Sequence, residues 1–121
     1  MSFFGLGRRK WAVRLLAEAG ISARSDVGTE LVEIILQGAK QFDEVARGVG
    51  NRLSDLDVCL MSVGTAIRNQ TATERLREVG GLDDQGLKEL LYNVLVAAKY
   101  VCETQGVSAG VAKFIYVGEE E

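Results

Sequence analysis

The chain contains no proline and no histidine among its 121 residues. Proline both lacks a backbone N–H and clashes with the preceding helical turn, so no residue here forces a helix to break. We therefore expect glycine, which occurs 14 times, to end the helices. Glycine readily adopts the left-handed backbone conformation of the residue that follows a helix. Because a chain of this length forms one domain around one core, we expect residues 1–121 to fold as a single all-α domain.

Apolar residues recur every three or four positions through much of the chain, which is the spacing of one buried helix face. Ser, Asp and Gly residues stand where such helices begin or end. The expected helices span about residues 8–19, 26–49, 52–69, 73–79 and 84–105. This pattern predicts a compact bundle of four to five helices.

The two helices expected between residues 26 and 69 carry matching apolar seams. The first seam is Leu31, Ile34/Ile35, Gly38, Phe42, Val45 and Val49, and the second is Leu53, Leu56, Leu60, Val63 and Ile67. The sequence Gly-Val-Gly-Asn at residues 48–51 favours a short turn between them. We therefore expect an antiparallel helical hairpin at the base of the bundle.

Two glycines, Gly38 and Gly64, fall inside expected helices. Glycine at such a position costs about 1 kcal/mol relative to alanine. Close approach of a second helix backbone would offset this cost, and it is the interpretation that we favour over a tolerated flaw. The second helix can belong to the same chain or to another copy.

Residues 107–117 admit two interpretations. The run Phe-Ile-Tyr-Val at residues 114–117 favours a strand by residue type, but no second strand is evident to pair with it. Ser108 can instead cap a short helix with Val111 and Ile115 on one side. We favour the short helix, with a single strand as the alternative.

The residues available for catalysis are few. Without histidine there is no Ser/His/Asp or Cys/His arrangement and no imidazole metal site. The remaining candidates for a metal-dependent hydrolase are the carboxylates of Glu30, Glu33, Asp55 and Asp57. Acids in a first helical turn, however, already complement the helix dipole. We therefore predict that the protein is not an enzyme and holds no metal or other cofactor.

The two cysteines, Cys59 and Cys102, adjoin the apolar stripes of their helices. Free cysteine behaves as a small hydrophobic residue and is commonly buried. Two cysteines without a secretory signal are typical of reduced thiols inside a cell. No apolar run approaches the roughly 20 residues of a membrane span, so we expect a cytoplasmic protein without a transmembrane segment.

Charge is unevenly distributed along the chain. Residues 1–24 hold five basic side chains and one acidic side chain, a net charge of +4, whereas residues 25–121 carry a net charge of −7. A basic head on an acidic body can dock on a neighbouring copy, bind an anionic partner, or only solvate a helix end. The overall charge of −3 disfavours a dedicated nucleic-acid-binding protein.

The basic N-terminal segment, residues 1–24, interleaves its cations with aromatic residues. The candidate partner-binding residues are Phe3, Phe4, Arg8, Arg9, Lys10, Trp11 and Arg14. Cations neutralise phosphates or acidic surfaces, and aromatic rings stack on bases or fill a partner's pocket. The alternatives are packing of Trp11 on the bundle with the cations in water, or a targeting or membrane-surface role.

Taken together, these features favour a small, non-enzymatic cytoplasmic interaction or assembly subunit that self-associates as a homo-oligomer or joins a larger complex. We expect its contacts to come from the N-terminal segment and from the apolar residues 107–117. The first alternative is an accessory subunit that contacts nucleic acid through Arg8, Arg9, Lys10 and Arg14. The second alternative is the carboxylate–metal hydrolase.

Overall fold

A computed structural model of the protein describes residues 3–117, with side chains from residue 7 onward, and every regular element in this range is an α-helix. The helices are α1 (Phe3–Glu18), α2 (Asp26–Gly48), α3 (Asp55–Ala66), α4 (Gln70–Gly80), α5 (Asp84–Gln105) and α6 (Ala109–Tyr116). The all-helical class predicted from the sequence is confirmed for these residues. The predicted count of four to five helices is too low, because residues 107–117 contribute a sixth helix, the interpretation favoured for them above.

The start of α2 and both ends of α5 coincide with capping residues that the sequence pattern indicated, whereas α3 is shorter than the expected helix 52–69 and α4 is longer than the expected helix 73–79. The Ser25 hydroxyl accepts a hydrogen bond of 3.0 Å from the Gly28 amide at the start of α2, and the Asp83 carboxylate accepts one of 2.7 Å from the Gly86 amide at the start of α5. Gly106 follows α5 with a φ of 61°. Side-chain acceptors satisfy free N–H groups at helix starts, and glycine adopts the left-handed conformation after helix ends without strain.

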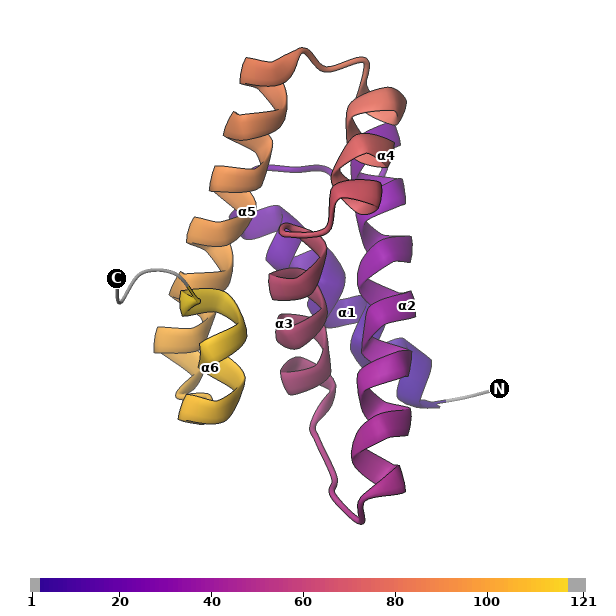
Figure 1. Cartoon of the computed structure of the whole chain (residues 1–121), viewed down its shortest axis with the longest axis vertical. Helices are drawn as coiled ribbons and strands as arrows, with labels where there is room; N and C mark the ends of the chain where they lie inside the picture. Colours follow the sequence, from indigo (N-terminus) through magenta and orange to yellow (C-terminus); the bar gives the residue numbers. More distant parts are fainter. Residues whose placement is uncertain (1–2, 118–121) are drawn as a thin grey trace.

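Helices α2 and α3 lie side by side and run in opposite directions (Figure 1). The two helices are in close contact at Gly38, where an added Cβ would collide with the side chain of Ser62. An added Cβ on Gly64 would likewise collide with the backbone carbonyl of Phe114 in α6. The prediction of close helix contacts at both glycines is confirmed, and both second helices belong to the same chain.

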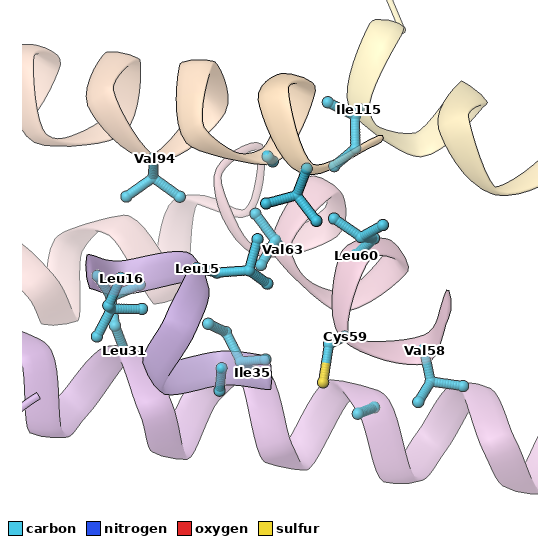
Figure 2. Close-up of a cluster of buried hydrophobic side chains, with 14 of the residues drawn as sticks. Leu15, Leu16, Leu31, Ile35, Val58, Cys59, Leu60, Val63, Val94 and Ile115 are labelled. Carbon is cyan, nitrogen blue, oxygen red and sulfur yellow. The ribbon is translucent and has the colours of Figure 1, made fainter. Parts of the chain in front are cut away.

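The core lies where α1, α2, α3, α5 and α6 converge, and α4 adds Leu76 to it (Figure 2). Its largest fully buried side chains are Leu16, Leu31, Ile35, Leu60, Leu76, Ile115, Val58, Val63 and Cys59. Two residues of the predicted α2 seam are misplaced, because Val45 is 69% and Val49 is 77% exposed. Arg8 pairs with both Asp43 in α2 and Asp55, the first residue of α3, so these two residues lie at the same level of the bundle. Val45 and Val49 come after Asp43 and therefore extend past the start of α3, which does not cover them.

The C-terminal helix α6 is fastened to the bundle by Arg68, just after α3. The guanidinium Nη1 donates to the carbonyl oxygens of Gly64 and Phe114, both at 2.9 Å. Nη2 donates to those of Ile115 at 3.1 Å and Val117 at 3.0 Å. The last carbonyls of a helix have no partner within it, and a cation there also complements the helix dipole.

We expect Gly38→Ala to lower the free energy of unfolding by about 1–3 kcal/mol, because the added methyl group overpacks the α2–α3 contact. The matched control is Gly48→Ala in the same helix, where a Cβ meets no atom within 4 Å. That substitution should be neutral or stabilising by up to about 1 kcal/mol. Urea unfolding followed by circular dichroism measures both changes, and equal effects of the two substitutions would contradict the close contact.

Candidate functional site

Arg8 is the cation that holds α1 on the bundle. Its Nη2 lies 3.0 Å from a carboxylate oxygen of Asp43 in α2, and its Nε lies 3.4 Å from one of Asp55 in α3. The side chain is only 13% exposed, and Arg47 also pairs with Asp43 at 3.1 Å. One guanidinium thus bridges three helices. Arg8 was expected among the partner-binding residues, but the structure engages its charge inside the molecule.

The backbone around Arg8 is equally constrained. The thiol of Cys59 donates a hydrogen bond to the Arg8 carbonyl at 3.4 Å. An added Cβ on Gly7 would collide with the Asp55 carboxylate. Glycine therefore lets the Asp55 side chain come close against the α1 backbone, beside the guanidinium that it pairs with.

The other predicted cations of α1 are exposed to solvent. Arg9 pairs with Glu33 at 3.5 Å, with both side chains more than half exposed. Lys10 is exposed and forms no ion pair within residues 7–117. The Arg14 guanidinium lies 4.9 Å from the ring centroid of Trp11, which is partly buried and packs against the core.

The side chains of Phe3 and Phe4, also predicted to bind a partner, lie outside the described residues. Within residues 7–117, the outer surface of α1 forms one continuous strip that we call the basic face. Its residues are Lys10, Val13, Arg14 and Ala17, which are all exposed and follow the spacing of a single helix face. The exposed carboxylate of Glu18 adjoins the strip at the end of α1. It lies opposite Ala12, Leu15 and Leu16, which pack in the core.

A second exposed face, on α5, was missed by the sequence analysis. Tyr92, Val96 and Tyr100 are 66%, 45% and 53% exposed and recur at intervals of four residues. At 100° per residue they lie opposite the buried residues of α5, which are Val94, Ala97, Ala98, Val101 and Cys102. The signal was available in the sequence, as two tyrosines and a valine on the side of the predicted helix that faces water.

The ends of this tyrosine stripe, defined as Tyr92, Val96 and Tyr100, are acidic. Glu89 precedes it and Glu103 follows it on the same side of α5. Both carboxylates accept hydrogen bonds from neutral groups. The Gln85 amide donates to Glu89 at 3.3 Å, and the Tyr116 hydroxyl donates to Glu103 at 3.2 Å. Neither acid forms an ion pair within residues 7–117. Two lysines flank the same surface: Lys88 is exposed next to Glu89, and the Lys99 ammonium lies 5.6 Å from the ring centroid of Tyr116.

A groove of about 530 Å³ lies between α2, the end of α3 and the first turns of α4. Its apolar lining includes Ile34, Phe42 and Ala66, and its hydrophilic lining includes the amides of Gln37 and Gln41. Its charged lining residues within the described chain, Glu30 and Arg75, pair with each other at 3.4 Å. The groove therefore presents no net charge.

The four carboxylates considered for a hydrolase each have another partner in the structure. Glu30 pairs with Arg75, Glu33 with Arg9 and Asp55 with Arg8. Asp57 accepts a hydrogen bond from the Ser54 amide in a capping box at the start of α3. Within the part of the chain that the structure describes, no group of three or more Cys, Asp or Glu side chains is placed to hold a metal ion.

Both thiols are buried. Desolvation, reinforced by the nearby Asp55 carboxylate, raises the pKa of the Cys59 thiol to about 12. Burial and the neighbouring Glu103 also raise the pKa of Cys102. Because the thiolate is the reactive form, both cysteines are protonated and poor nucleophiles near neutral pH.

Comparison of the chain with protein-family models, with curated proteins and with solved structures found no match. Among the described residues, no helix is both long and apolar enough to cross a membrane. The candidate site therefore rests on the geometry of the two exposed faces, the basic face of α1 and the tyrosine stripe of α5.

Adjacent arginines of α1 provide a matched test of which cation is structural. We expect Arg8→Met to lower the free energy of unfolding by about 1–3 kcal/mol. It removes the cation that Asp55 pairs with and leaves the mostly buried Asp43 carboxylate with Arg47 alone. Arg9→Met removes only an exposed pair and should cost at most about 1 kcal/mol. Urea unfolding measures both, and an Arg9→Met effect as large as that of Arg8→Met would contradict the assignment.

Proposed function

We propose that the protein is a non-enzymatic interaction or assembly subunit of the cytoplasm whose docking surface is the tyrosine stripe of α5. The observation that carries this proposal is the exposure of Tyr92, Val96 and Tyr100 together on one helix face. Tyrosine is enriched at protein interfaces, because it buries a large apolar ring and still offers a hydroxyl group. Among residues 7–117 the stripe lies on the side of α5 that faces away from the core, and about half or more of each side chain is open to solvent.

Two further observations support a binding role over a catalytic one. The carboxylates that could serve a hydrolase are engaged in ion pairs or a helix cap. The thiols have raised pKa values, and the chain has no histidine. The catalytic candidates named from the sequence are therefore paired, used in a helix cap or protonated, and this supports a binding role over a catalytic one.

The docking surface differs in part from the one expected from the sequence. The apolar residues Val111 and Ile115 of the C-terminal segment are buried in the core, so this segment is used inside the molecule. In the N-terminal segment, Arg8 is engaged by Asp43 and Asp55. The proposal therefore rests on the α5 stripe and on the outward cations of α1.

Nucleic-acid contact is the second candidate function, and it is supported by the exposed cations Arg9, Lys10 and Arg14 beside Trp11. Three cations neutralise few phosphates, and phosphate contacts supply most of the affinity of such proteins. The net charge of −3 opposes the same interaction. We therefore place protein partners first.

Site-specific photo-crosslinking in cells tests the proposal. A benzophenone amino acid replaces Tyr92 or Tyr100 in turn, and in the control it replaces Lys40, an exposed residue of α2. We expect protein adducts from both stripe positions, with the crosslinked peptides identified by mass spectrometry, and none from the control. The absence of adducts at the stripe, or equal yields at all three positions, would contradict a docking role for α5.

A further inference from the structure

We propose that the groove between α2, the end of α3 and the first turns of α4 binds a small uncharged molecule that has an apolar body and a hydrogen-bonding group. Its volume of about 530 Å³ falls within the range of about 300–1,000 Å³ that is typical of small-molecule sites. Among the described residues, none from α5 lines it. The inference is therefore independent of the function proposed for the tyrosine stripe.

The apolar part of the groove is held in place by packing inside the domain. The Phe42 ring meets the Phe114 ring of α6 edge to face, with the ring centroids 5.3 Å apart. Ile34 packs against the core, and Ala66 is buried. Because contacts with α3 and α6 fix these residues, the apolar wall is formed before a ligand binds, and little conformational entropy is lost on binding.

Polar groups that can orient a ligand lie along the same groove. Gln37 and Gln41 are one helical turn apart on α2, and both side chains are exposed. Neither side-chain amide has a hydrogen-bond partner among residues 7–117. Across the groove, the Asn69 side-chain oxygen accepts a bond of 2.9 Å from the Ala72 amide at the start of α4. Each glutamine amide can both donate and accept, so the groove suits a ligand with an amide, amine or hydroxyl group.

The charged groups that line the groove are already paired. Within the described chain these are Glu30 and Arg75, whose side chains lie 3.4 Å apart. Arg68 follows α3 close to the lining, but its guanidinium donates to carbonyl oxygens at the end of α6. A ligand in the groove therefore meets no cation or anion that lacks a partner.

The other charged residues within 30–45 and 62–75 lead to the same conclusion. Glu33, Asp43 and Glu74 each pair with an arginine. Lys40 and Glu44 remain, and they have opposite signs, lie one turn apart on α2 and are not part of the groove lining. A charged ligand would lose its hydration without gaining a free counter-ion, so the groove favours an uncharged one.

Fluorescence titration of the full chain with two probes tests this inference. Phenylnaphthylamine is uncharged, and anilinonaphthalenesulfonate has the same ring systems with an added sulfonate. The variant A72F places a ring in the groove, because Ala72 lines it. The matched control, A109F, places the same ring on an exposed alanine in the first turn of α6. Circular dichroism checks that each variant folds, and NMR chemical shifts of the wild type with the uncharged probe locate the site without any variant.

We expect the wild type and A109F to bind the uncharged probe saturably, with one probe per chain. The sulfonate probe should bind the wild type at least about tenfold more weakly. A72F should weaken binding of the uncharged probe at least about tenfold, because the added ring occupies the volume that the probe needs. The NMR shift changes should be confined to residues 30–45, 62–69 and 71–75.

Several results would overturn the inference. They are no saturable binding of the uncharged probe, equal or tighter binding of the sulfonate probe, equal affinities of folded A72F and A109F, or shift changes centred on α5. If A72F does not fold, the comparison of the probes and the wild-type shifts decide. Protein adducts from a benzophenone amino acid at Gln41, without probe binding, would assign the groove to a polypeptide partner and reject the proposal.

Discussion

The attachment of α1 to the bundle determines what the rest of the surface presents. Arg8 reaches Asp43 and Asp55 on two other helices, and Leu15 and Leu16 are buried in the core beside it. An ion pair at a mostly buried site is costly to break, so the contacts of Arg8 with both acids help to fix the rotation of α1 about its axis. With that rotation set, Lys10 and Arg14 face water. The N-terminal cations are thereby divided between one that maintains the fold and others that are available to a partner.

The other helices likewise have one set of residues that packs inside the domain and another that is exposed to solvent. Glycine at positions 38 and 64 allows α2, α3 and α6 to pack at close range, and Arg68 fastens the end of α6 by hydrogen bonds to its last carbonyls. These contacts place the C-terminal apolar residues in the core. Within residues 7–117, the exposed side chains of α5 then form a surface that faces away from this core, with Lys88 and Glu89 at one end and Glu103 at the other.

Much of the fold follows from local chemistry that can be read along the chain. The caps at Ser25 and Asp83 and the stop at Gly106 depend on neighbouring residues only, and the periodic stripes predict which faces are buried. Long-range facts could not be obtained in this way. The exposure of Val45 depends on where α3 begins, and the role of Arg8 depends on acids 35 and 47 positions later in the chain. The tyrosine stripe was visible in the sequence, but its exposure depends on how the helices of residues 3–117 pack around α5.

The central claim is that α1 is an integral part of the folded domain and not a free basic arm. The chain has one tryptophan, Trp11, and it lies in α1, partly buried against the core, so its fluorescence reports on this helix alone. The direct measurement is urea unfolding followed in parallel by tryptophan fluorescence and by helical circular dichroism. We expect the two transitions to coincide, as in cooperative unfolding of one unit, with native emission shifted to the blue of free tryptophan. A fluorescence transition at lower urea than the loss of helix, or native emission like that of free tryptophan in water, would contradict the account.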